Sequence, residues 1–440
     1  MLMEIRRDHY LNQLIERRGD GLVKVITGIR RCGKSYLLFG LFRNWLLGHG
    51  ISKESIVEFA FDNEEHLDLL APYYPEEPTK IHVDKKKGKY VVNAKKFRAF
   101  VRDKANGEGD YYLLLDEVQL LEDFVGTLNG LLSHRNYDIY VTGSNSRFLS
   151  KDVATEFRAR GEQVHVSPLS FAEFFANRTD SFDEAFEDYA TYGGLPLVAT
   201  MQSDERKATY LKDLLDHLYQ KDVIERYDVE SVDSISTLMD ILASGIGCYA
   251  NPAKIEATFK SERGVAYHHD TIARHIAYMK DCFLIEEAKR FDVKGRKYIG
   301  ANSKYYWTDL GLRNARLRFR QQEMTHIMEN IIYNELRARG YDVDVGIVGT
   351  KEKGADGAYS PKQYEVDFVC NRGSERIYVQ SAYALPDEAK IRQETRPFSA
   401  TRDSFRKIVV VRTPIKAWTD ENGIRFISLK DFLLNADALR

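Results

Sequence analysis

Residues 22–38, which read LVKVITGIRRCGKSYLL, constrain the fold of this chain more than any other stretch. A run of apolar and β-branched residues stops at Gly28, then Gly33, Lys34 and Ser35 follow, and a second apolar run has helical character. This strand, loop and helix order is that of a phosphate-binding loop with the pattern GxxxxGK[ST]. The two glycines allow consecutive backbone N–H groups to point into one cup at the positive end of the helix. The stretch therefore predicts an α/β domain that holds the phosphates of a nucleotide.

Each side chain of the loop has a chemical role in this interpretation. Lys34 is expected to reach the β- and γ-phosphates of ATP as a point charge and so to act in catalysis. The Ser35 hydroxyl is expected to be one ligand of the Mg²⁺ ion that bridges those phosphates. The predicted ATP-binding residues are Gly28, Ile29, Arg30, Arg31, Cys32, Gly33, Lys34, Ser35 and Tyr36. The alternative is a glycine-rich turn that matches by chance, and the strand before it and the helix after it argue against that.

A second apolar strand, residues 111–117 (YYLLLDE), ends in two acids. Such a strand is buried on both faces of a parallel sheet, and its carboxyl end then lies beside the phosphate loop. We expect Asp116 to hold Mg²⁺ through water and Glu117 to polarise the water that attacks the γ-phosphate. Asp62 also ends an apolar strand and is the rival of Asp116 for the metal. Asp116 is preferred because only Asp116 is followed directly by a second acid that can act as a base.

A further strand, residues 137–142, runs into the polar segment GSNSRFL. A polar side chain at that point can contact the γ-phosphate or orient the attacking water, and Asn145 or Ser144 is the candidate. The alternative is a simple turn, because Gly, Ser and Asn favour turns wherever they occur. Asn145 is therefore predicted as a catalytic residue.

Four segments of the chain carry a resemblance to one family: GIRRCGKS, the strand that ends in DE, TGSNS and the tract TEFRARGEQVHVSPLSFAEFF (155–175). With these segments the chain resembles the bacterial and archaeal AAA-type ATPases of the additional-strand P-loop class. The resemblance implies a parallel sheet with helices on both faces. It also implies a strand between those that carry the loop and the acid pair, and residues 56–62 (IVEFAFD) are expected there. In the same way it implies that Arg158 or Arg160 is an arginine finger, acting in cis or from a neighbouring subunit. A pair of surface arginines is the alternative.

Residues 231–312 predict a winged helix-turn-helix. Helices are expected over 231–244, 252–259 and 271–281, and strands over 283–291 and 297–306. Three helices followed by a two-stranded wing are the order of that fold.

The same region carries a local excess of positive charge. Between positions 289 and 320 there are ten Lys or Arg residues against two acids, an excess of eight, in a chain whose formal net charge is −2. Phosphate contacts need such an excess, so DNA is the expected partner. The predicted contacts are Arg274, Lys294, Arg296 and Lys297. The alternative is a winged helix that docks to protein, with its basic residues paired to acids elsewhere in the chain.

Residues 320–440 resemble the core of a PD-(D/E)XK nuclease, with a helix over 324–340 and strands over 343–348, 364–369 and 377–382. Such a nuclease needs acids that hold Mg²⁺ and a lysine that activates hydroxide. Glu329 and Asp367 match the acids, whereas Gln380 stands where a second strand acid belongs and Ala382 where the lysine belongs. The resemblance therefore implies a degenerate, α/β restriction-endonuclease-like domain that does not cleave.

With 440 residues the chain is long enough for about three domains. We expect an AAA-type P-loop ATPase core over 1–165, a helical lid or connector over 166–230, the winged helix over 231–312 and the nuclease-like domain over 320–440. The four cysteines stand far apart without a CxxC pair, the N-terminus is charged, and no apolar run is long enough to span a bilayer. These features predict a cytoplasmic protein with no membrane partner.

The combined features predict an enzyme that binds and hydrolyses ATP with Mg²⁺ and couples turnover to movement of its C-terminal half, in association with nucleic acid. Two alternatives stay open. One is an ATP-gated switch with little turnover, whose output is binding to DNA or a partner. The other is an ATPase linked to a DNA nuclease, which Gln380 and Ala382 disfavour. A homo-oligomer or a protein partner is needed if the arginine acts in trans.

Overall fold

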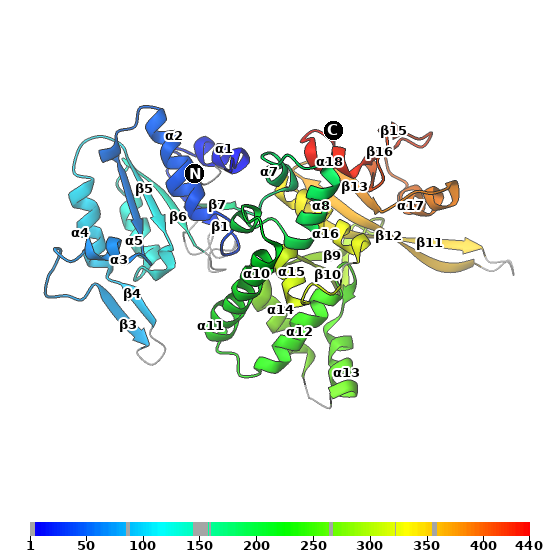
Figure 1. The fold of residues 1–440 in the computed structure, drawn as a ribbon, viewed down its shortest axis with the longest axis horizontal. Helices are drawn as coiled ribbons and strands as arrows, with labels where there is room; N and C mark the ends of the chain where they lie inside the picture. Colours follow the sequence, from blue (N-terminus) through cyan, green and yellow to red (C-terminus); the bar gives the residue numbers. More distant parts are fainter. Residues whose placement is uncertain are drawn as a thin grey trace. The chain divides into compact units, whose positions relative to one another are not determined.

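The computed structural model of the chain describes residues 5–84, 89–143, 157, 160–263, 267–321, 323–353 and 359–440. The chain forms two compact units, Met1–Ser167 and Pro168–Arg440 (Figure 1). The expected ATPase core lies in the first unit. The segments expected to form the lid, the winged helix and the nuclease-like domain all lie in the second unit.

The first unit is built on a sheet of five parallel strands in the order β2-β5-β6-β1-β7. The strands are β1 (Val23–Thr27), β2 (Ile56–Ala60), β5 (Tyr111–Asp116), β6 (Tyr137–Thr142) and β7 (Gly161–His165). The predicted parallel sheet is therefore confirmed. The prediction that residues 56–62 lie between the loop strand and the acid strand is wrong, because β6 takes that place and β2 forms the edge. A parallel crossover can pass over a neighbouring strand, so order along the chain does not determine order in the sheet.

Helices cover both faces of this sheet, as expected. On one face, α4 (Ala94–Lys104) and α5 (Phe124–Leu132) pack with alternate strand residues in one continuous core. On the other face, the helix after the loop, formed by η1 (Tyr36–Phe42) and α2 (Arg43–Gly48), packs on β6, with the Phe42 and Tyr140 ring centroids 4.5 Å apart. The remaining elements are α1 (Asp8–Glu16), η2 (Lys53–Ser55), α3 (Glu64–Asp68), β3 (Lys80–Asp84), β4 (Lys89–Val92) and η3 (Val118–Leu120).

The second unit begins with helices and interleaves further helices with strands. Its helical elements are α7 (Phe171–Phe175), α8 (Phe182–Tyr192), α9 (Pro196–Ala199), α10 (Asp204–Leu218), η5 (Tyr219–Ile224), α11 (Glu225–Tyr227), α12 (Val232–Ser244), α13 (Pro252–Arg263), α14 (His269–Asp281), α15 (Leu310–Arg316), α16 (Met324–Ala338), α17 (Glu388–Thr401) and α18 (Leu429–Leu434). Helices α12, α13 and α14 lie where the winged-helix pattern expects three helices.

A buried acid joins the lid segment to the end of the winged-helix segment. The Asp309 carboxylate accepts hydrogen bonds from the backbone N–H of Gly194 at 2.8 Å and of Leu312 at 3.1 Å. Burial raises the pKa of Asp309 to about 6, although these backbone donors oppose the shift. The amide of Asn314 adds bonds of 2.9 Å to the carbonyl oxygens of Ala190 and Thr191. The two segments therefore pack as one body.

The sheet of the second unit is mixed and has nine strands, in the order β15-β16-β14-β13-β12-β11-β9-β10-β8. The strands are β8 (Tyr249–Ala250), β9 (Ile285–Asp292), β10 (Lys297–Trp307), β11 (Asp342–Lys353), β12 (Tyr359–Arg372), β13 (Glu375–Ala382), β14 (Arg406–Val411), β15 (Trp418–Thr419) and β16 (Ile424–Ser428). The expected wing strands β9 and β10 are present, but β9 also pairs in parallel with β11 through Arg290 and Val345. The wing and the C-terminal strands therefore share one sheet, and the winged-helix and nuclease-like folds stay predictions.

Among the described residues, no helix is both long and apolar enough to cross a membrane.

Candidate functional site

The phosphate loop leaves β1 at Gly28 in a conformation that a side chain would prevent. Gly28 has a φ of 140° and Gly33 a φ of 102°. A Cβ at Gly28 would also collide with the carbonyl oxygen of Val166, because the segment after β7 runs close beside the loop. The backbone N–H of Val166 holds that segment in place through a 2.8 Å bond to the carbonyl oxygen of Thr27. The glycines of the pattern are therefore required by backbone angle and by close approach.

Lys34 is almost fully buried within the loop itself. Its Nζ donates hydrogen bonds to the carbonyl oxygens of Gly28 at 2.9 Å and of Ile29 at 3.0 Å. These two carbonyl groups hold the Lys34 ammonium against the loop that the sequence predicts to bind phosphate. A lysine in this place can exchange carbonyl partners for phosphate oxygens without leaving the loop.

The first acid of the pair lies at the carboxyl end of β5 and is bonded to two hydroxyl groups. The Thr142 hydroxyl, at the end of β6, donates to Asp116. Burial raises the pKa of Asp116, while hydrogen bonds from Thr142 and from Ser35 act in the opposite direction and nearby Glu117 raises it further. The structure therefore brings the loop hydroxyl of Ser35 and the acid Asp116 together, as the sequence predicts for two ligands of one ion.

Glu117 follows with a strained backbone that turns the chain away from the strand. It has a φ of 53°, and its N–H donates to the Thr142 hydroxyl oxygen at 3.1 Å. Its carboxylate accepts a hydrogen bond from the amide of Gln119. Thr142 thus contacts both acids, donating to one and accepting from the other. A non-glycine residue with positive φ at such a point is a common mark of a functional position.

Asp62 belongs to the same group of side chains. β2 pairs with β5 so that Ala60 lies opposite Asp116, and the Phe61 N–H bonds to the Asp116 carbonyl oxygen at 3.0 Å. Burial raises the pKa of Asp62 and the charge of Glu117 raises it further, whereas Arg30 and His66 lower it. The two candidates for the metal, Asp62 and Asp116, therefore both lie at this edge of the sheet. Sequence reasoning missed Thr142 and Gln119, although Thr142 ends a strand beside the acid pair.

The remaining predicted residues of the first unit are placed only in part. Asn145, Ser144 and Arg158 lie outside the described residues. The side chain of Arg160 is exposed, and its carbonyl oxygen accepts a 2.8 Å bond from the N–H of Val23. Val23 begins β1, whereas Gly28 follows its end, so Arg160 lies at the end of the strand that is away from the loop.

A second group of acids lies in the second unit and contains a lysine. Lys304, on β10, places its Nζ 2.9 Å from Glu329 Oε1 and 2.7 Å from Glu365 Oε1. The Tyr306 hydroxyl donates to the same Glu329 oxygen at 2.6 Å. Asp367 accepts a 2.8 Å bond from the Ser381 N–H, and its own N–H donates to the amide oxygen of Gln380 at 3.2 Å. The structure thus brings together the predicted residues Glu329, Asp367 and Gln380 and adds Lys304, which sequence reasoning missed.

The charges in this cluster follow from burial and from the lysine. Burial works to lower the pKa of Lys304, but Glu329, Glu365 and Asp367 outweigh burial and raise it. Burial works to raise the pKa of Glu329, but Lys304, His326 and Tyr306 outweigh it and lower the value. Burial and the charge of Glu329 raise the pKa of Asp367 well above its usual range. Within the cluster, the acids favour the ammonium form of Lys304, and Lys304 favours the ionised form of Glu329. Burial and the charge of Glu329 favour the protonated form of Asp367.

The four predicted nucleic-acid contacts divide into two places. Lys294, Arg296 and Lys297 are all exposed at the turn between β9 and β10, where Arg296 has a φ of 52°. Arg274 is exposed on α14. Other members of the basic excess are internal: Arg313 is 1% exposed and bonds the carbonyl oxygen of Ala243 at 2.9 Å. Lys304 and Arg313 therefore both serve the interior, but only Lys304 pairs with acids in the way that the alternative interpretation describes, whereas Arg313 bonds to oxygen atoms of uncharged groups.

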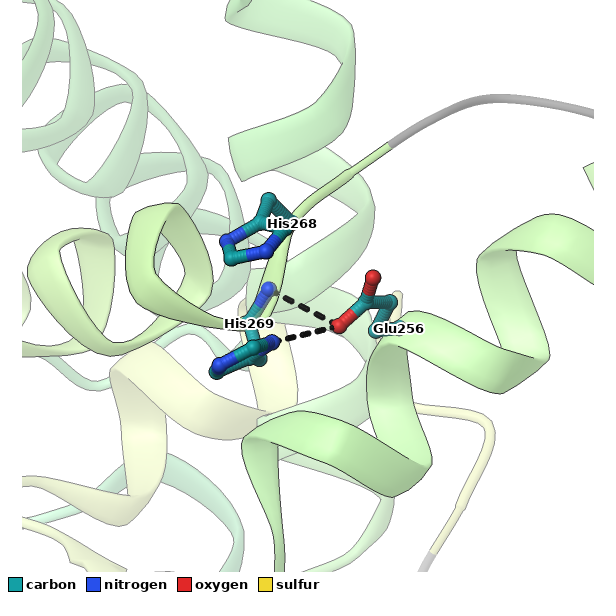
Figure 2. A group of neighbouring side chains, drawn as sticks. All are labelled: Glu256, His268 and His269. Atoms are coloured by element: carbon teal, nitrogen blue, oxygen red, sulfur yellow. Dashed lines mark hydrogen bonds and ion pairs between the residues drawn. The ribbon is translucent and has the colours of Figure 1, made fainter.

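Among the described residues, Glu256, His268 and His269 are the one group of three His, Cys, Asp or Glu side chains whose ligand atoms all lie within 4.8 Å of one another (Figure 2). His269 Nδ1 lies 2.8 Å from Glu256 Oε2, and the His269 N–H donates to the same oxygen at 3.1 Å. Hydrogen bonding to His269 lowers the pKa of Glu256. His268 accepts from the Asp270 N–H at 3.4 Å, at the start of α14. Hydrogen bonds within the group account for its arrangement.

Comparison with known proteins places these observations in a family. Residues 20–175 match a family described as an AAA domain, and residues 183–323 match a domain of unknown function (DUF8612). Among solved structures, the Aeropyrum pernix ORC1 protein in complex with DNA is 14% identical and covers 72% of this chain and 94% of that chain, with a TM-score of 0.29. So low a TM-score supports no inference about function.

Two relatives match over nearly the full length. A protein from Methanocaldococcus jannaschii, named uncharacterized protein MJ1544, is 27% identical over 426 residues, which are 93% of this chain and 85% of that protein. An uncharacterized protein from Haemophilus influenzae is 31% identical over 436 residues, which are 98% of both chains. Identity at this level along almost two whole chains shows common descent, and the chain, whose residues 20–175 match the AAA domain, therefore belongs to the same family as the Haemophilus influenzae protein.

Proposed function

We propose that the protein binds ATP with Mg²⁺ at residues 28–36 and hydrolyses it, with Glu117 as the residue that polarises water. The observation that carries this proposal is the hydroxyl network in which Ser35 and Thr142 both bond to Asp116, directly beside Glu117. This network joins the phosphate loop, which follows β1, to the acid pair at the end of β5, although β6 lies between these two strands in the sheet. A structural turn alone would not require this convergence.

The chain's own residues divide the chemistry among them. Lys34 holds the phosphates by charge, in place of the two carbonyl oxygens that it contacts now. Ser35 and Asp116, with Asp62 beside them, are the oxygen ligands that suit Mg²⁺, directly or through water. Mg²⁺, when bound, supplies positive charge that offsets the charge of the phosphates. Glu117, fixed through its N–H to Thr142, orients and polarises the attacking water.

The arginine that completes such a site is proposed on geometric grounds. Arg160 lies beside the start of β1, away from the loop of its own chain. A role for Arg160 therefore requires a neighbouring subunit, so that a homo-oligomer is part of this proposal. Arg158 stays a candidate in cis or in trans.

The second unit is proposed to contact nucleic acid without cleaving it. The Lys304 ammonium lies against Glu329 and Glu365, so it already supplies the positive charge that a metal ion would bring to these acids. Gln380 and Ala382 stand at two positions where the nuclease pattern needs an acid and a lysine. Magnesium-dependent nicking of a plasmid by the purified protein, abolished by Asp367→Ala, would contradict this part of the proposal.

The experiment that tests the ATPase is Mg²⁺-dependent turnover by the full chain, with and without duplex DNA. Lys34→Ala is expected to abolish turnover, and Glu117→Gln to abolish turnover while ATP still binds. Glu122→Gln, a change at an exposed acid five residues further on, is the matched control and is expected to turn over ATP normally. Undiminished turnover in Lys34→Ala would overturn the assignment. Tight ATP binding without turnover in the native protein would instead favour the ATP-gated switch.

A further inference from the structure

Strands β11 and β12 continue together well beyond the rest of their sheet. β9 pairs with β11 only over Val345–Ile347, and β13 pairs with β12 only from Phe368 onward. Beyond these points β11 and β12 pair with each other from Val348 and Tyr364 out to Lys353 and Tyr359. Among the described strands, no other pairs with this part. Residues 348–353 and 359–364 therefore form a two-stranded arm, the β-arm, that projects from the second unit (Figure 1).

A pocket of about 680 Å³ lies at the base of the β-arm, between the arm, α17 and the turn after β9. Its lining residues are Lys294, Gly349, Thr350, Lys351, Pro361, Lys362, Gln363, Tyr364, Arg396, Ser399, Ala400 and Arg402. Five of these residues are Lys or Arg, and none of the described lining residues is acidic. Three separate segments contribute the five cations, so the grouping is a property of the fold and not of one basic run.

The walls of the pocket hold several of these cations in place. Lys294 Nζ donates to the Gly349 carbonyl oxygen at 2.7 Å, which joins the turn to the arm. Lys362 Nζ lies 5.4 Å and the Arg396 guanidinium carbon 4.9 Å from the ring centre of Tyr364. Two cations on the pocket wall thus lie close to one aromatic ring. Charges of one sign in a concave site repel one another and attract a polyanion strongly.

From this arrangement we infer that the pocket and the β-arm are the nucleic-acid interface of the protein and bind the phosphate backbone of duplex DNA. The inference rests on the proposed association with nucleic acid and names the surface that makes it. A two-stranded β-ribbon fits the major groove of a duplex, and cations at its base then lie along the phosphates. A lipid surface is flat and would meet the projecting arm before the pocket, so a membrane fits this shape less well.

Helix α14, which a winged helix would place in the major groove, offers fewer positive charges than the pocket does. Lys280 of α14 is paired with Glu287 at 2.5 Å. His275 is 4% exposed, and its ring bonds the hydroxyl of Tyr267 at 2.5 Å. His269 is bonded to Glu256. Arg274 is therefore the one exposed arginine or lysine of α14, all of which is described, whereas five lysines and arginines line the pocket.

The test is binding of a fluorescent duplex DNA of mixed sequence to the full chain, measured by anisotropy over a range of salt concentrations. Five phosphate contacts predict that log K falls against log salt with a slope of about −4.5. Lys351→Glu with Lys362→Glu is expected to weaken binding by about tenfold or more and to reduce the slope by about 2. Lys53→Glu with Lys430→Glu changes net charge equally at exposed sites outside the pocket and is the matched control. The milder Lys351→Gln with Lys362→Gln serves if the charge reversals disturb folding.

Each contrary outcome has a distinct meaning. DNA binding that Arg274→Glu abolishes, while the arm variant retains it, would overturn the inference and place the contact on α14. Binding to phosphatidylserine vesicles but not to DNA would overturn it in favour of a lipid partner. No DNA binding by the native protein would overturn both the inference and the proposed association with nucleic acid. ATP turnover, measured on the same samples, tests the first unit separately and does not depend on the arm.

Discussion

The two units of this protein each bury acids near the ends of strands, but they neutralise those acids differently. In the first unit, Asp116 is bonded to the hydroxyls of Thr142 and Ser35. In the second unit, Glu329 is bonded to the Lys304 ammonium and the Tyr306 hydroxyl. Hydroxyl groups stabilise a carboxylate but add no positive charge, whereas an ammonium group cancels the charge within the chain. In the proposed function, the first site takes its cation from solution together with the nucleotide, whereas Lys304 supplies a cation to the second site from within the chain.

This difference shows why a pattern of acids does not by itself predict a metal site. Both groups have carboxylates of the type that binds Mg²⁺, and the sequence patterns predict both as metal ligands. In each unit, the group that bonds to the acid lies outside the sequence pattern that predicts the metal site. It is Thr142, at the end of β6, in the first unit and Lys304, on β10, in the second.

The largest effect is expected at Glu117. Replacement by Gln keeps the size of the side chain and the backbone N–H of residue 117, but it removes the negative charge that polarises water. Turnover is therefore expected to fall by about 10²- to 10⁴-fold. ATP affinity is expected to change little, because the N–H of residue 117 still bonds Thr142. Steady-state turnover and equilibrium nucleotide binding measure the two effects. Equal losses in both would mean that Glu117 supports the structure of the site and not the chemical step.

Removal of Lys304 is the next largest change and acts on stability. Lys304→Met leaves Glu329 and Glu365 without their counter-charge, which is expected to cost about 3–5 kcal/mol in the free energy of unfolding. Urea denaturation of the full chain, followed by a probe of the second unit, measures the loss.

The double variant Lys304→Met with Glu329→Gln is the control for this prediction. It removes the carboxylate together with its partner and is expected to recover part of the stability, because the unpaired charge is gone. A double variant less stable than Lys304→Met alone would mean that Lys304 contributes by packing and not by charge.

A smaller effect is expected at Thr142. Thr142→Val keeps the shape of the side chain but removes the hydroxyl that donates to Asp116 and accepts from the Glu117 N–H. Misplacing both acids is expected to lower turnover by about tenfold with ATP binding largely kept. Thr127, a buried threonine on α5 whose hydroxyl accepts a hydrogen bond from Arg98, provides the control variant Thr127→Val. If Thr142→Val turned over ATP like the native protein, the hydroxyl network would not be what sets the position of the acids.

The smallest effect is expected at Asp367 and depends on pH. The pKa of Asp367 is raised in the folded chain by burial and by Glu329, so the folded chain keeps this proton to a higher pH than the unfolded chain does. Stability from the protonated form is therefore present below the ordinary value of 3.8 and is lost as pH rises. Asp367→Asn should raise the free energy of unfolding at pH 7, and the gain should shrink as pH falls toward 3.8. A gain in stability that grows toward low pH would show that folding lowers the pKa of Asp367 instead of raising it.

Local features of the first unit could be predicted from the sequence because a short stretch determines them. The glycine angles, Lys34 and Ser35 follow from one short pattern, and the Asp116–Glu117 pair follows from a second short pattern at the end of β5. The place of β6 between β1 and β5 could not, because strand order depends on how distant segments pack. Lys304 was missed for the same reason: it lies 25 residues before Glu329 and reaches it only through the fold. The basic excess predicted a charged surface, yet Arg313 and Lys304 satisfy buried groups inside.

The most direct test of this contrast is a count of Mn²⁺ ions bound per chain, by electron paramagnetic resonance, in the presence and absence of ATP. The account predicts one nucleotide-dependent Mn²⁺, which Asp116→Asn or Lys34→Ala weakens or removes and which Glu329→Gln leaves unchanged. Mn²⁺ binding that needs no ATP and is lost in Glu329→Gln would show that the second acid cluster is a metal site despite Lys304. An absence of any ATP-dependent Mn²⁺ would contradict the account of the nucleotide site in the first unit.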